Sequence, residues 1–232
     1  MVASVRDLAG NAGSATQTLT VELNPAPVAL GTASTYSVLA AMGASNLGPT
    51  TLSGDLGVSP AGTISGFGGL GEGAVAGTTH LNDASSARAM GDMITAYNDV
   101  AARIPRSGIA GDLNGQIFRP GVYHAAAAIS LAAAGTITLD GEGNPNAVFI
   151  FQIGAALSTG ALSSINLVNG ATAANVFWQV LGAASTGAGS SFSGTMMAQG
   201  NIALGLAARL TGRALSTSTV ALATNTVTSS SP

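Results

Sequence analysis

Two segments of this chain nearly repeat each other, and this repetition restricts the possible fold more than any other feature. Residues 147–153 read AVFIFQI and residues 175–180 read NVFWQV, so that Gln152 and Gln179 occupy equivalent positions. A second pattern, an apolar residue followed by Ser or Thr and then Gly, recurs at residues 52–54, 192–194 and 210–212. Internal repetition of this kind is typical of solenoids, in which each repeat packs mainly against its neighbours.

The distances between the repeats agree with a stacked fold. Looser copies of the second pattern begin at Ile137 and Ile165. Successive copies begin at residues 137, 165, 192, 210 and 227, so the intervals between neighbouring copies are 28, 27, 18 and 17 residues. Intervals of this size are typical of solenoid repeats. We therefore expect outward side chains to form rows, so that function resides in a surface.

The composition indicates a folded protein with very few charges. Asp, Glu, Lys and Arg make up 7% of the residues, whereas about 25% is usual in soluble domains. Regularly placed Val, Ile, Leu and Phe residues supply enough apolar surface for a packed core. The net charge is −3 and the seven basic residues are scattered. We therefore expect neither nucleic acid nor an anionic membrane surface as a partner.

Cysteine usage and hydropathy limit the cellular context. The chain contains no cysteine, which excludes disulfides and thiol chemistry and is compatible with a secreted or a cytosolic protein. No apolar run reaches the roughly 18–20 residues of a membrane span, so we expect no membrane insertion. The first residues lack the basic segment and apolar core of a signal peptide. We expect Met1 to mark the start of an expressed fragment.

The first 27 residues differ from the remainder of the chain. Residues 16–23 alternate in polarity, which predicts a strand, and the Asn-Pro-Ala-Pro sequence at 24–27 predicts a stiff linker. Residues 5–11 resemble the last turn of a bacterial immunoglobulin-like repeat. We therefore divide the chain into residues 1–23, the tail of a preceding immunoglobulin-like repeat or a strand extension, a linker at 24–27 and a β-helix domain at 28–232. This arrangement predicts a secreted or cell-surface location within a larger modular protein.

One helix is predicted between residues 82 and 105. Asn82 or Asp83 can cap its start, and Pro105 ends it. Apolar residues follow at alternating intervals of three and four, which predicts one apolar stripe along Ala87, Met90, Ile94, Tyr97, Ala101 and Ile104. A single amphipathic helix must pack against a larger body, here the side of the β-solenoid. We interpret Met90, Met93 and Tyr97 as packing residues.

The remaining segments are interpreted as rungs of the solenoid and a loop. Short apolar runs within residues 30–60 predict the first rungs, and residues 61–80 are so rich in Gly that they predict a capping loop anchored by Phe67. Residues 125–128 are all Ala and favour helix by propensity, but the flanking Gly and β-branched residues continue the rung pattern. Phe151 and Trp178 alternate within apolar runs and are expected in the core.

Five motifs resemble those of a known family. In chain order they are GDLGVSP at 54–60, PGVY at 120–123, NPNAVFIFQ at 144–152, NVFWQV at 175–180 and GRAL at 212–215. Over residues 28–228 the sequence is similar to the microbial ice-binding proteins of the DUF3494 type. This resemblance implies a mainly β protein, built as a discontinuous, right-handed, three-sided β-helix with one long helix packed alongside. It also implies adsorption of a monomer to ice through one flat face, without catalysis, cofactor or metal.

Aligned repeats give a candidate for that face. The residues immediately before the apolar residue of each rung are mostly short hydroxyl residues: Thr51, Thr136, Ser164, Ser191, Arg209 and Thr226. Stacked strands lie about 4.7–4.9 Å apart, a spacing capable of ordering water in a regular lattice. With the neighbouring positions, the candidate ice-binding face comprises Thr50, Thr51, Thr136, Ser163, Ser164, Ser190, Ser191, Ala208, Arg209, Thr224 and Thr226. Arg209 interrupts the row, so we expect weak to moderate activity.

Other residues offer little chemistry. His80 and His124 lie far apart in the sequence and belong to no ligand-spacing motif, and Asp55 follows a Gly in a predicted tight turn. Residues 140–144 lack the ligand pattern of a calcium loop, and residues 66–71 lack the βαβ context of a dinucleotide site. We therefore predict no catalytic residue, no metal site and no cofactor.

Two other functions remain open at this point. The first is a β-helix that binds or cleaves polysaccharide, although the ten acidic residues are dispersed, whereas a cleaving enzyme needs clustered acids or bases. The second is an adhesion module in which the β-helix anchors a cell to a surface, which is compatible with ice as that surface. Ice-affinity partitioning, compared with glycan binding, separates these functions.

Overall fold

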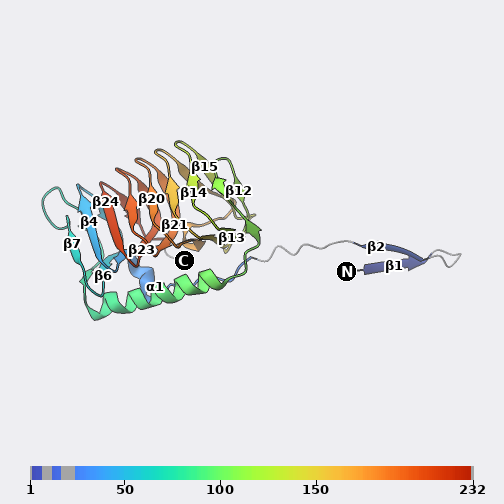
Figure 1. Cartoon of the computed structure of the whole chain (residues 1–232), viewed down its shortest axis with the longest axis horizontal. Helices are drawn as coiled ribbons and strands as arrows, with labels where there is room; N and C mark the ends of the chain where they lie inside the picture. Colours follow the sequence, from blue (N-terminus) through green and yellow to red (C-terminus); the bar gives the residue numbers. More distant parts are fainter. Residues whose placement is uncertain (1, 7–11, 17–23, 231–232) are drawn as a thin grey trace.

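The computed structural model describes residues 2–6, 12–16 and 24–230, and its main body is a β-helix with one helix along its side (Figure 1). Three parallel ladders of strands form the three sides of this β-helix. Each rung contributes one strand to each of the three ladders, so neighbouring rungs pair along all three sides. The expected three-sided β-helix is therefore confirmed.

We call the first ladder the helix-side face, because helix α1 packs on it. Its strands, in spatial order, are β10 (Ser107–Gly108), β13 (Gly121–Ala125), β16 (Phe149–Ile153), β19 (Val176–Val180), the second half of β21 (Ser191–Ala198), the second half of β23 (Arg209–Ser216), β3 (Tyr36–Ala40), β6 (Asp55–Val58) and β9 (Thr79–Leu81). The two near-repeats of the sequence are β16 and β19, which pair directly, with Gln152 opposite Gln179.

The other two ladders carry no helix. The Thr/Ser face consists of β12 (Ile117–Phe118), β15 (Thr136–Asp140), β18 (Ser164–Val168), the first halves of β21 and β23, β25 (Thr226–Thr228), β5 (Thr51–Leu52) and β8 (Ala74–Val75). The Ser/Ala face consists of β11 (Gly111–Asp112), β14 (Ile129–Leu131), β17 (Leu157–Thr159), β20 (Ala184–Thr186), β22 (Ile202–Leu204), β24 (Thr219–Ala223), β4 (Gly43–Leu47) and β7 (Thr63–Ser65).

The rungs do not stack in chain order. Strand β3, the first strand of the β-helix in the sequence, pairs with β23 on one side and with β6 on the other. Likewise, β4 pairs with β24 and β5 pairs with β25. The C-terminal rung is therefore enclosed between the N-terminal rungs and the middle of the chain. This arrangement confirms the predicted discontinuity.

The interior of the β-helix is apolar and contains an aromatic stack. Phe151 lies between Tyr123 and Trp178, with ring centroids 5.4 Å and 4.0 Å away and planes inclined by 19° and 8°. These three residues are register partners on β13, β16 and β19, so the stack follows directly from the ladder. Phe151 and Trp178 are fully buried, as the sequence predicted.

Helix α1 spans Ala84–Ala102 and begins with a capping box. The carboxylate of Asp83 accepts a hydrogen bond from the backbone N–H of Ser86, and the Ser86 hydroxyl accepts one from the N–H of Asp83. The buried residues are Ser86, Ala89, Met90, Met93, Ala96, Tyr97 and Val100. The apolar stripe was therefore predicted partly wrongly. Met90 and Tyr97 are buried as predicted, but Ala87 and Ala101 are exposed, Ile94 is 43% exposed and Ile104, beyond the end of the helix, is 89% exposed. The buried side of the helix is instead centred on Met93, with Ala89 and Ala96 on either side of it.

Two other expectations need correction or lie outside the described residues. The segment 61–80 is not a featureless loop, because β7, β8 and the start of β9 extend the three ladders by a further rung. Phe67 is half-buried against the core, in agreement with its predicted anchoring role. Near the N-terminus, β1 (Val2–Arg6) pairs antiparallel with β2 (Ala12–Thr16). Of the strand predicted at 16–23, only Thr16 lies within the described residues.

The linker residues are fastened to the β-helix. The side-chain amide of Asn24 donates to the carbonyl of Asn146 at 2.8 Å and its side-chain oxygen accepts from the N–H of Val148 at 2.7 Å. The guanidinium of Arg103 donates to the carbonyls of Ala26 and Pro27 and pairs with Asp99. The segment that leads into the domain is thus held by hydrogen bonds at both of its ends.

Candidate functional site

The Thr/Ser face contains one continuous column of outward residues. Backbone pairing joins Thr136 to Ser164, Ser164 to Ser191, Ser191 to Arg209, Arg209 to Thr226 and Thr226 to Thr51. This column is the one obtained by aligning the repeats in the sequence, in the spatial order of the discontinuous stack. Thr51, Ser191 and Arg209 are exposed and the other three are half-buried. The hydroxyls of Thr136 and Ser164 lie 3.2 Å apart and share a hydrogen bond.

A second outward column, which the sequence analysis missed, runs beside the first. It lies two residues further along each strand and contains Thr138, Asn166, Ser193, Thr211, Thr228 and Ser53. Residues i and i+2 of a strand share one face of a sheet, so the alternation of the aligned repeats was the signal that could have found it. The two columns together make the Thr/Ser face two rows of short polar side chains wide.

Four predicted face residues are wrong, because their side chains are buried. Thr50, Ser163, Ser190 and Ala208 are at most 2% exposed. The hydroxyls of Ser163 and Ser190 each donate, at 2.7 Å, to the carbonyl three residues earlier, at Gly160 and Gly187. These side chains close the corner between the Ser/Ala face and the Thr/Ser face.

The same corner is completed by an asparagine in one rung. Ala208 has no hydroxyl, and the side-chain amide of Asn225 donates instead to the carbonyls of Gly205 and Ala208. Thr50 accepts a hydrogen bond from the N–H of Asn225 at 2.9 Å. The short polar residues that precede the face therefore satisfy buried backbone groups, which is why they cannot contact a surface outside.

The turn at this corner has left-handed backbone geometry in five rungs. The residues with positive φ are Ala134, Leu162, Gly189, Ala207 and Thr224, with φ between 53° and 64°. Only one of the five is Gly, although this conformation costs other residues about 1–2 kcal/mol. Thr224, the last residue of the predicted face, therefore lies at the corner, where its side chain is half-buried against Gly48.

Arg209 is the one charged residue in the first column. It lies on β23, between Ser191 on β21 and Thr226 on β25, and its side chain is exposed. Among the described residues, no ion pair or side-chain hydrogen bond involves Arg209. A long, hydrated side chain therefore rises from the middle of a surface that otherwise presents short groups. The expected interruption of the row is thus placed near its centre.

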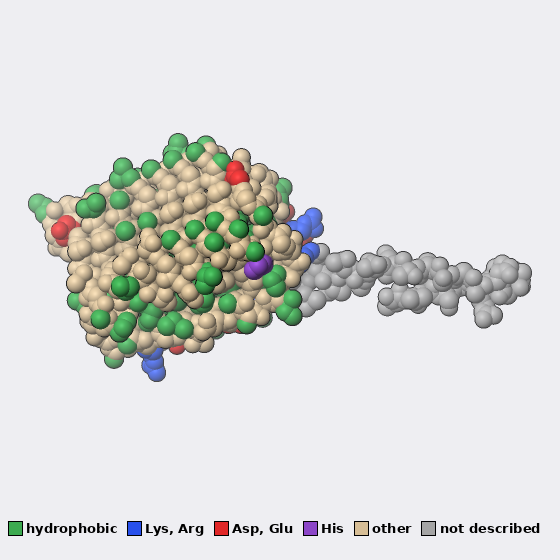
Figure 2. Space-filling view, viewed as in Figure 1, with side chains coloured by type: hydrophobic (Ala, Val, Ile, Leu, Met, Phe, Trp, Pro, Cys, Tyr) green, Lys and Arg blue, Asp and Glu red, His purple; other side chains and the backbone are tan. Residues whose placement is uncertain are grey.

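The Ser/Ala face is a second open surface with different side chains. Its central outward column contains Asp112, Ser130, Ser158, Ser185, Ala203, Ala221, Ser45 and Ser65. Figure 2, which views this face, shows neutral and hydrophobic atoms over β4, β24, β20 and β14, with the charged groups near the margins. This face has fewer threonine side chains in its outward columns than the Thr/Ser face. It serves below as an internal comparison.

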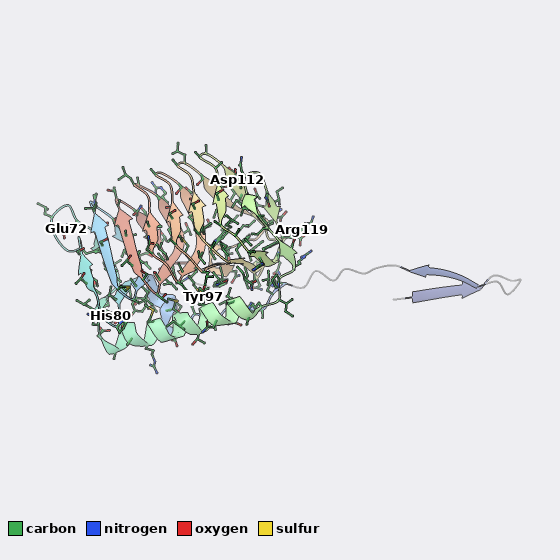
Figure 3. The ribbon with its side chains drawn as sticks, viewed as in Figure 1. Glu72, His80, Tyr97, Asp112 and Arg119 are labelled. Atoms are coloured by element: carbon green, nitrogen blue, oxygen red, sulfur yellow. The ribbon has the colours of Figure 1, made fainter. Side chains whose placement is uncertain are left out.

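The remaining ionisable groups lie mainly at the ends and edges of the β-helix. Figure 3 shows Glu72 at one end, Asp112 and Arg119 towards the other, and His80 near the start of α1. Arg119 pairs with Glu142 at 2.7 Å. A hydrogen bond from the N–H of Glu142, supported by the Asn169 side chain, lowers the pKa of Asp140. These contacts stabilise turns and do not converge on a shared cleft.

The acidic and histidine side chains do not cluster in the part of the chain that the structure describes. Within residues 2–6, 12–16 and 24–230, no three His, Asp or Glu side chains lie close enough together to hold a metal ion. No helix within the described residues combines the length and apolarity needed to cross a bilayer. The geometry therefore directs attention to the flat faces.

Comparison with known proteins identifies the family. The family model described as ice-binding-like matches residues 38–228, which is most of the chain. The chain belongs to the ice-binding-like family. An ice-binding protein from Nostoc sp. (strain HG1) is 41% identical over 176 residues, which cover 75% of this chain and 63% of the Nostoc protein. An ice-binding protein from the fungus Flammulina populicola is 34% identical over 226 residues and covers 89% of this chain and 90% of its own length.

Solved structures of the family share the architecture. A crystal structure of an ice-binding protein from an Antarctic biological consortium superposes with a TM-score of 0.85 at 37% identity and covers 91% of this chain and 95% of its own. The ice-binding protein of the Antarctic ascomycete Antarctomyces psychrotrophicus also gives a TM-score of 0.85 at 37% identity, covering 89% and 100% of the two chains. The discontinuous β-helix with its flanking helix is therefore the fold of this ice-binding-like family.

Proposed function

We propose that this protein adsorbs to ice through the Thr/Ser face and thereby inhibits ice growth and recrystallisation. Its family supplies the class of ligand, since relatives in bacteria and fungi are named ice-binding proteins. The observation that carries the choice of face is the unbroken register of the column from Thr136 to Thr51 across six strands. The residues proposed to contact ice directly are Thr51, Thr136, Ser164, Ser191, Thr226 and, at the margin, Thr224.

The register supports adsorption for a physical reason. Adjacent strands of a ladder lie about 4.7–4.9 Å apart, so equivalent hydroxyl groups repeat at a fixed interval along the β-helix. Thr51, Thr136 and Thr226 each add a methyl group beside the hydroxyl groups of this surface. Such a surface can hold ordered water between its methyl groups while its hydroxyls anchor that water, and the ordered water can then merge with an ice lattice. No bond is made or broken, so no catalytic residue is required.

Arg209 limits this surface. Its long, charged side chain is exposed between the short side chains of Ser191 and Thr226, so a flat ice plane cannot approach both sides of the column equally. We therefore propose weak to moderate activity rather than the activity of an uninterrupted face.

Paired Tyr substitutions on the two open faces test the assignment. Ser191→Tyr and Thr226→Tyr place a bulky ring on the Thr/Ser face, Ser158→Tyr does so on the Ser/Ala face, and Thr95→Tyr does so on the exposed side of α1. Thermal hysteresis and ice-affinity partitioning are measured for each purified variant, with circular dichroism to confirm folding. We expect both activities to disappear in Ser191→Tyr and Thr226→Tyr and to persist in the other two variants.

Each alternative result has a definite meaning. Loss of activity in Ser158→Tyr alone would assign ice binding to the Ser/Ala face. Unchanged activity in Ser191→Tyr and Thr226→Tyr would reject the Thr/Ser face. Unshaped, disc-like crystal growth in the unmodified protein, with no ice partitioning, would reject ice adsorption altogether.

We further propose that the protein acts as a monomer outside the cell or at its surface, because that is where ice grows. The fastening of residues 24–27 by Asn146, Val148 and Arg103 supports a connection to a preceding module at a defined position. Adhesion to ice as a cell-anchoring surface is compatible with this arrangement. Analytical ultracentrifugation of the ice-active protein tests the monomeric state.

A further inference from the structure

A small cavity lies away from both open faces, between the segment that follows the linker and the helix-side face. Its volume is about 260 Å³. Its lining is mainly apolar and includes Val28, Leu30, Ala174 and Phe177. One charged residue, Arg213, is part of this lining. Val28, Leu30 and Phe177 belong to the apolar cluster that packs with α1, but neither this packing nor the proposed ice-binding residues account for Arg213 and the cavity beside it.

Arg213 is almost completely buried, at 3% exposed. Its Nε donates to the carbonyl of Ser34 at 2.9 Å and its Nη2 donates to the carbonyl of Ser230 at 2.5 Å. Within the described residues, Nη1 makes no hydrogen bond and no carboxylate pairs with the guanidinium. Two of the three nitrogens therefore fasten the chain near both ends of the domain, and one remains available.

A buried cation without an anionic partner is unusual. Removing a charge from water costs several kcal/mol unless the charge is paired, and two neutral carbonyls offset only part of this cost. Burial also lowers the pKa of Arg213, which reflects the same loss of hydration. The nearest acidic group along this segment is Asp92, which contacts Gly31 from outside the lining and is held by the N–H and hydroxyl of Thr32. An anion entering the cavity would supply the missing partner.

We propose that this cavity is a binding site for a small carboxylate with an apolar body, such as a short-chain fatty acid. Its carboxylate would accept hydrogen bonds from Nη1 of Arg213, because charge-assisted bonds to a desolvated guanidinium are stronger than neutral ones. Its hydrocarbon part would contact Val28, Leu30 and Phe177. The volume is slightly below that of common drug-sized pockets, about 300–1,000 Å³, which restricts the ligand to a few carbon atoms.

The site would also connect to the fold. The residues lining the cavity come from the segment 27–34, the turn at 174–175 and strands β19 and β23. A bound carboxylate would therefore contact the segment 27–34 and the C-terminal rung at the same time. We expect it to raise the unfolding temperature, since a ligand that binds only the folded state stabilises that state.

The test uses hexanoate as the probe and hexanamide, its neutral counterpart, as the matched control. Binding is measured by isothermal titration calorimetry and by ¹⁵N–¹H NMR shifts of residues 28–31 and 174–177. We expect hexanoate to bind at least tenfold more tightly than hexanamide. No ice is needed, so the result is independent of the proposed ice adsorption.

Two variants keep the test decisive. Arg213→Met removes the cation, and we expect it to abolish the preference for hexanoate over hexanamide. If this variant does not fold, Ala174→Leu fills the cavity while retaining Arg213, and we expect hexanoate binding to weaken at least tenfold. Absence of hexanoate binding by the unmodified protein, equal binding of hexanamide, or full binding by Ala174→Leu would each overturn the proposal.

Discussion

The strongest prediction concerns Gln152, which joins the β-helix to the end of α1. Its side-chain amide donates to the carbonyl of Val100 at 2.7 Å and to the carbonyl of Arg103 at 2.8 Å, and the side chain is 5% exposed. Val100 lies in the last turn of the helix and Arg103 is its C-cap, so both carbonyls belong to the helix end. The Val100 carbonyl also accepts a longer hydrogen bond, 3.3 Å, from the N–H of Arg103. Gln152→Leu keeps a similar volume but removes both donors.

The expected loss follows from the burial of the two carbonyls. The Val100 carbonyl is buried but keeps its hydrogen bond from the N–H of Arg103, so losing the Gln152 donor costs about 0.5–1.5 kcal/mol. The Arg103 carbonyl is only partly buried, so water can replace the donor and the loss there is also about 0.5–1.5 kcal/mol. The sum is about 1–3 kcal/mol. In a protein of this size each kcal/mol lowers the unfolding temperature by about 2–4 °C, which gives a decrease of roughly 2–12 °C.

Differential scanning calorimetry measures this change, and hydrogen exchange of residues 98–103 shows whether the end of the helix has loosened. Gln199→Leu is the matched control, since Gln199 is exposed and its substitution should change the unfolding free energy by less than about 0.5 kcal/mol. Thermal hysteresis should persist below the unfolding transition, because Gln152 is on the helix-side face. A decrease of less than about 0.5 kcal/mol in Gln152→Leu would refute the assignment of the helix anchor to this side chain.

Three further predictions concern the open face, its corner and the start of the helix. Arg209→Thr should increase thermal hysteresis by completing the hydroxyl column, and equal or lower activity in a folded variant would show that Arg209 does not limit adsorption. Leu162→Gly should stabilise the fold by about 0.5–1 kcal/mol, measured by chemical denaturation. The reason is that relief of the left-handed strain, about 1–2 kcal/mol, exceeds the entropic cost of Gly, about 0.5–1 kcal/mol. A destabilised variant would show that the Leu162 side chain, although 71% exposed, contributes more through packing. A hydrogen bond from the N–H of Ser86, with the His80 side chain next in effect, lowers the pKa of Asp83 to about 2 from 3.8. The stabilising effect of the Asp83 carboxylate is therefore complete above pH 3.8 and is lost as the pH falls from 3.8 through about 2. Asp83→Asn should lack this part of the pH dependence of the unfolding temperature, and an identical acid profile in both proteins would contradict it.

The sequence was sufficient for the parts of the fold that repeat. The alignment of Thr136, Ser164, Ser191, Arg209 and Thr226 matches the register of the ladders, because each rung has an apolar residue at the same position and the ladders contain no shift between these strands. The start of α1 was also predictable, since the sequence offered Asn82 or Asp83 as the cap and Asp83 is the N-cap of the helix, which begins at Ala84. The ice-binding role of the column itself remains a proposal.

Other features depend on contacts that local sequence does not encode. Ser163 and Ser190 have the same residue types as the outward column beside them, and only the left-handed turn that precedes them directs their hydroxyls inward. The buried side of α1 was misassigned because Met93 and Ile94 are both apolar, and the shape of the facing ladder selects Met93. Arg213 contacts Ser34 at a separation of 179 residues, a pairing that follows from the discontinuous stack.

The order of the rungs also has a consequence for how the chain reaches its folded state. Strand β3 requires β23 as its partner, and the hydroxyls of Ser53 and Ser229, which share a hydrogen bond, are 176 residues apart. During synthesis the first rungs of the β-helix therefore emerge long before the rung that joins them to the rest. Pairing over such distances slows folding, because the entropy of closing a long loop is lost before the contacts form. Until the last rung is made, β3 and β21 lack β23 as their common partner and leave unpaired edges, and a chain shortened at its C-terminus would retain those edges as sites for aggregation.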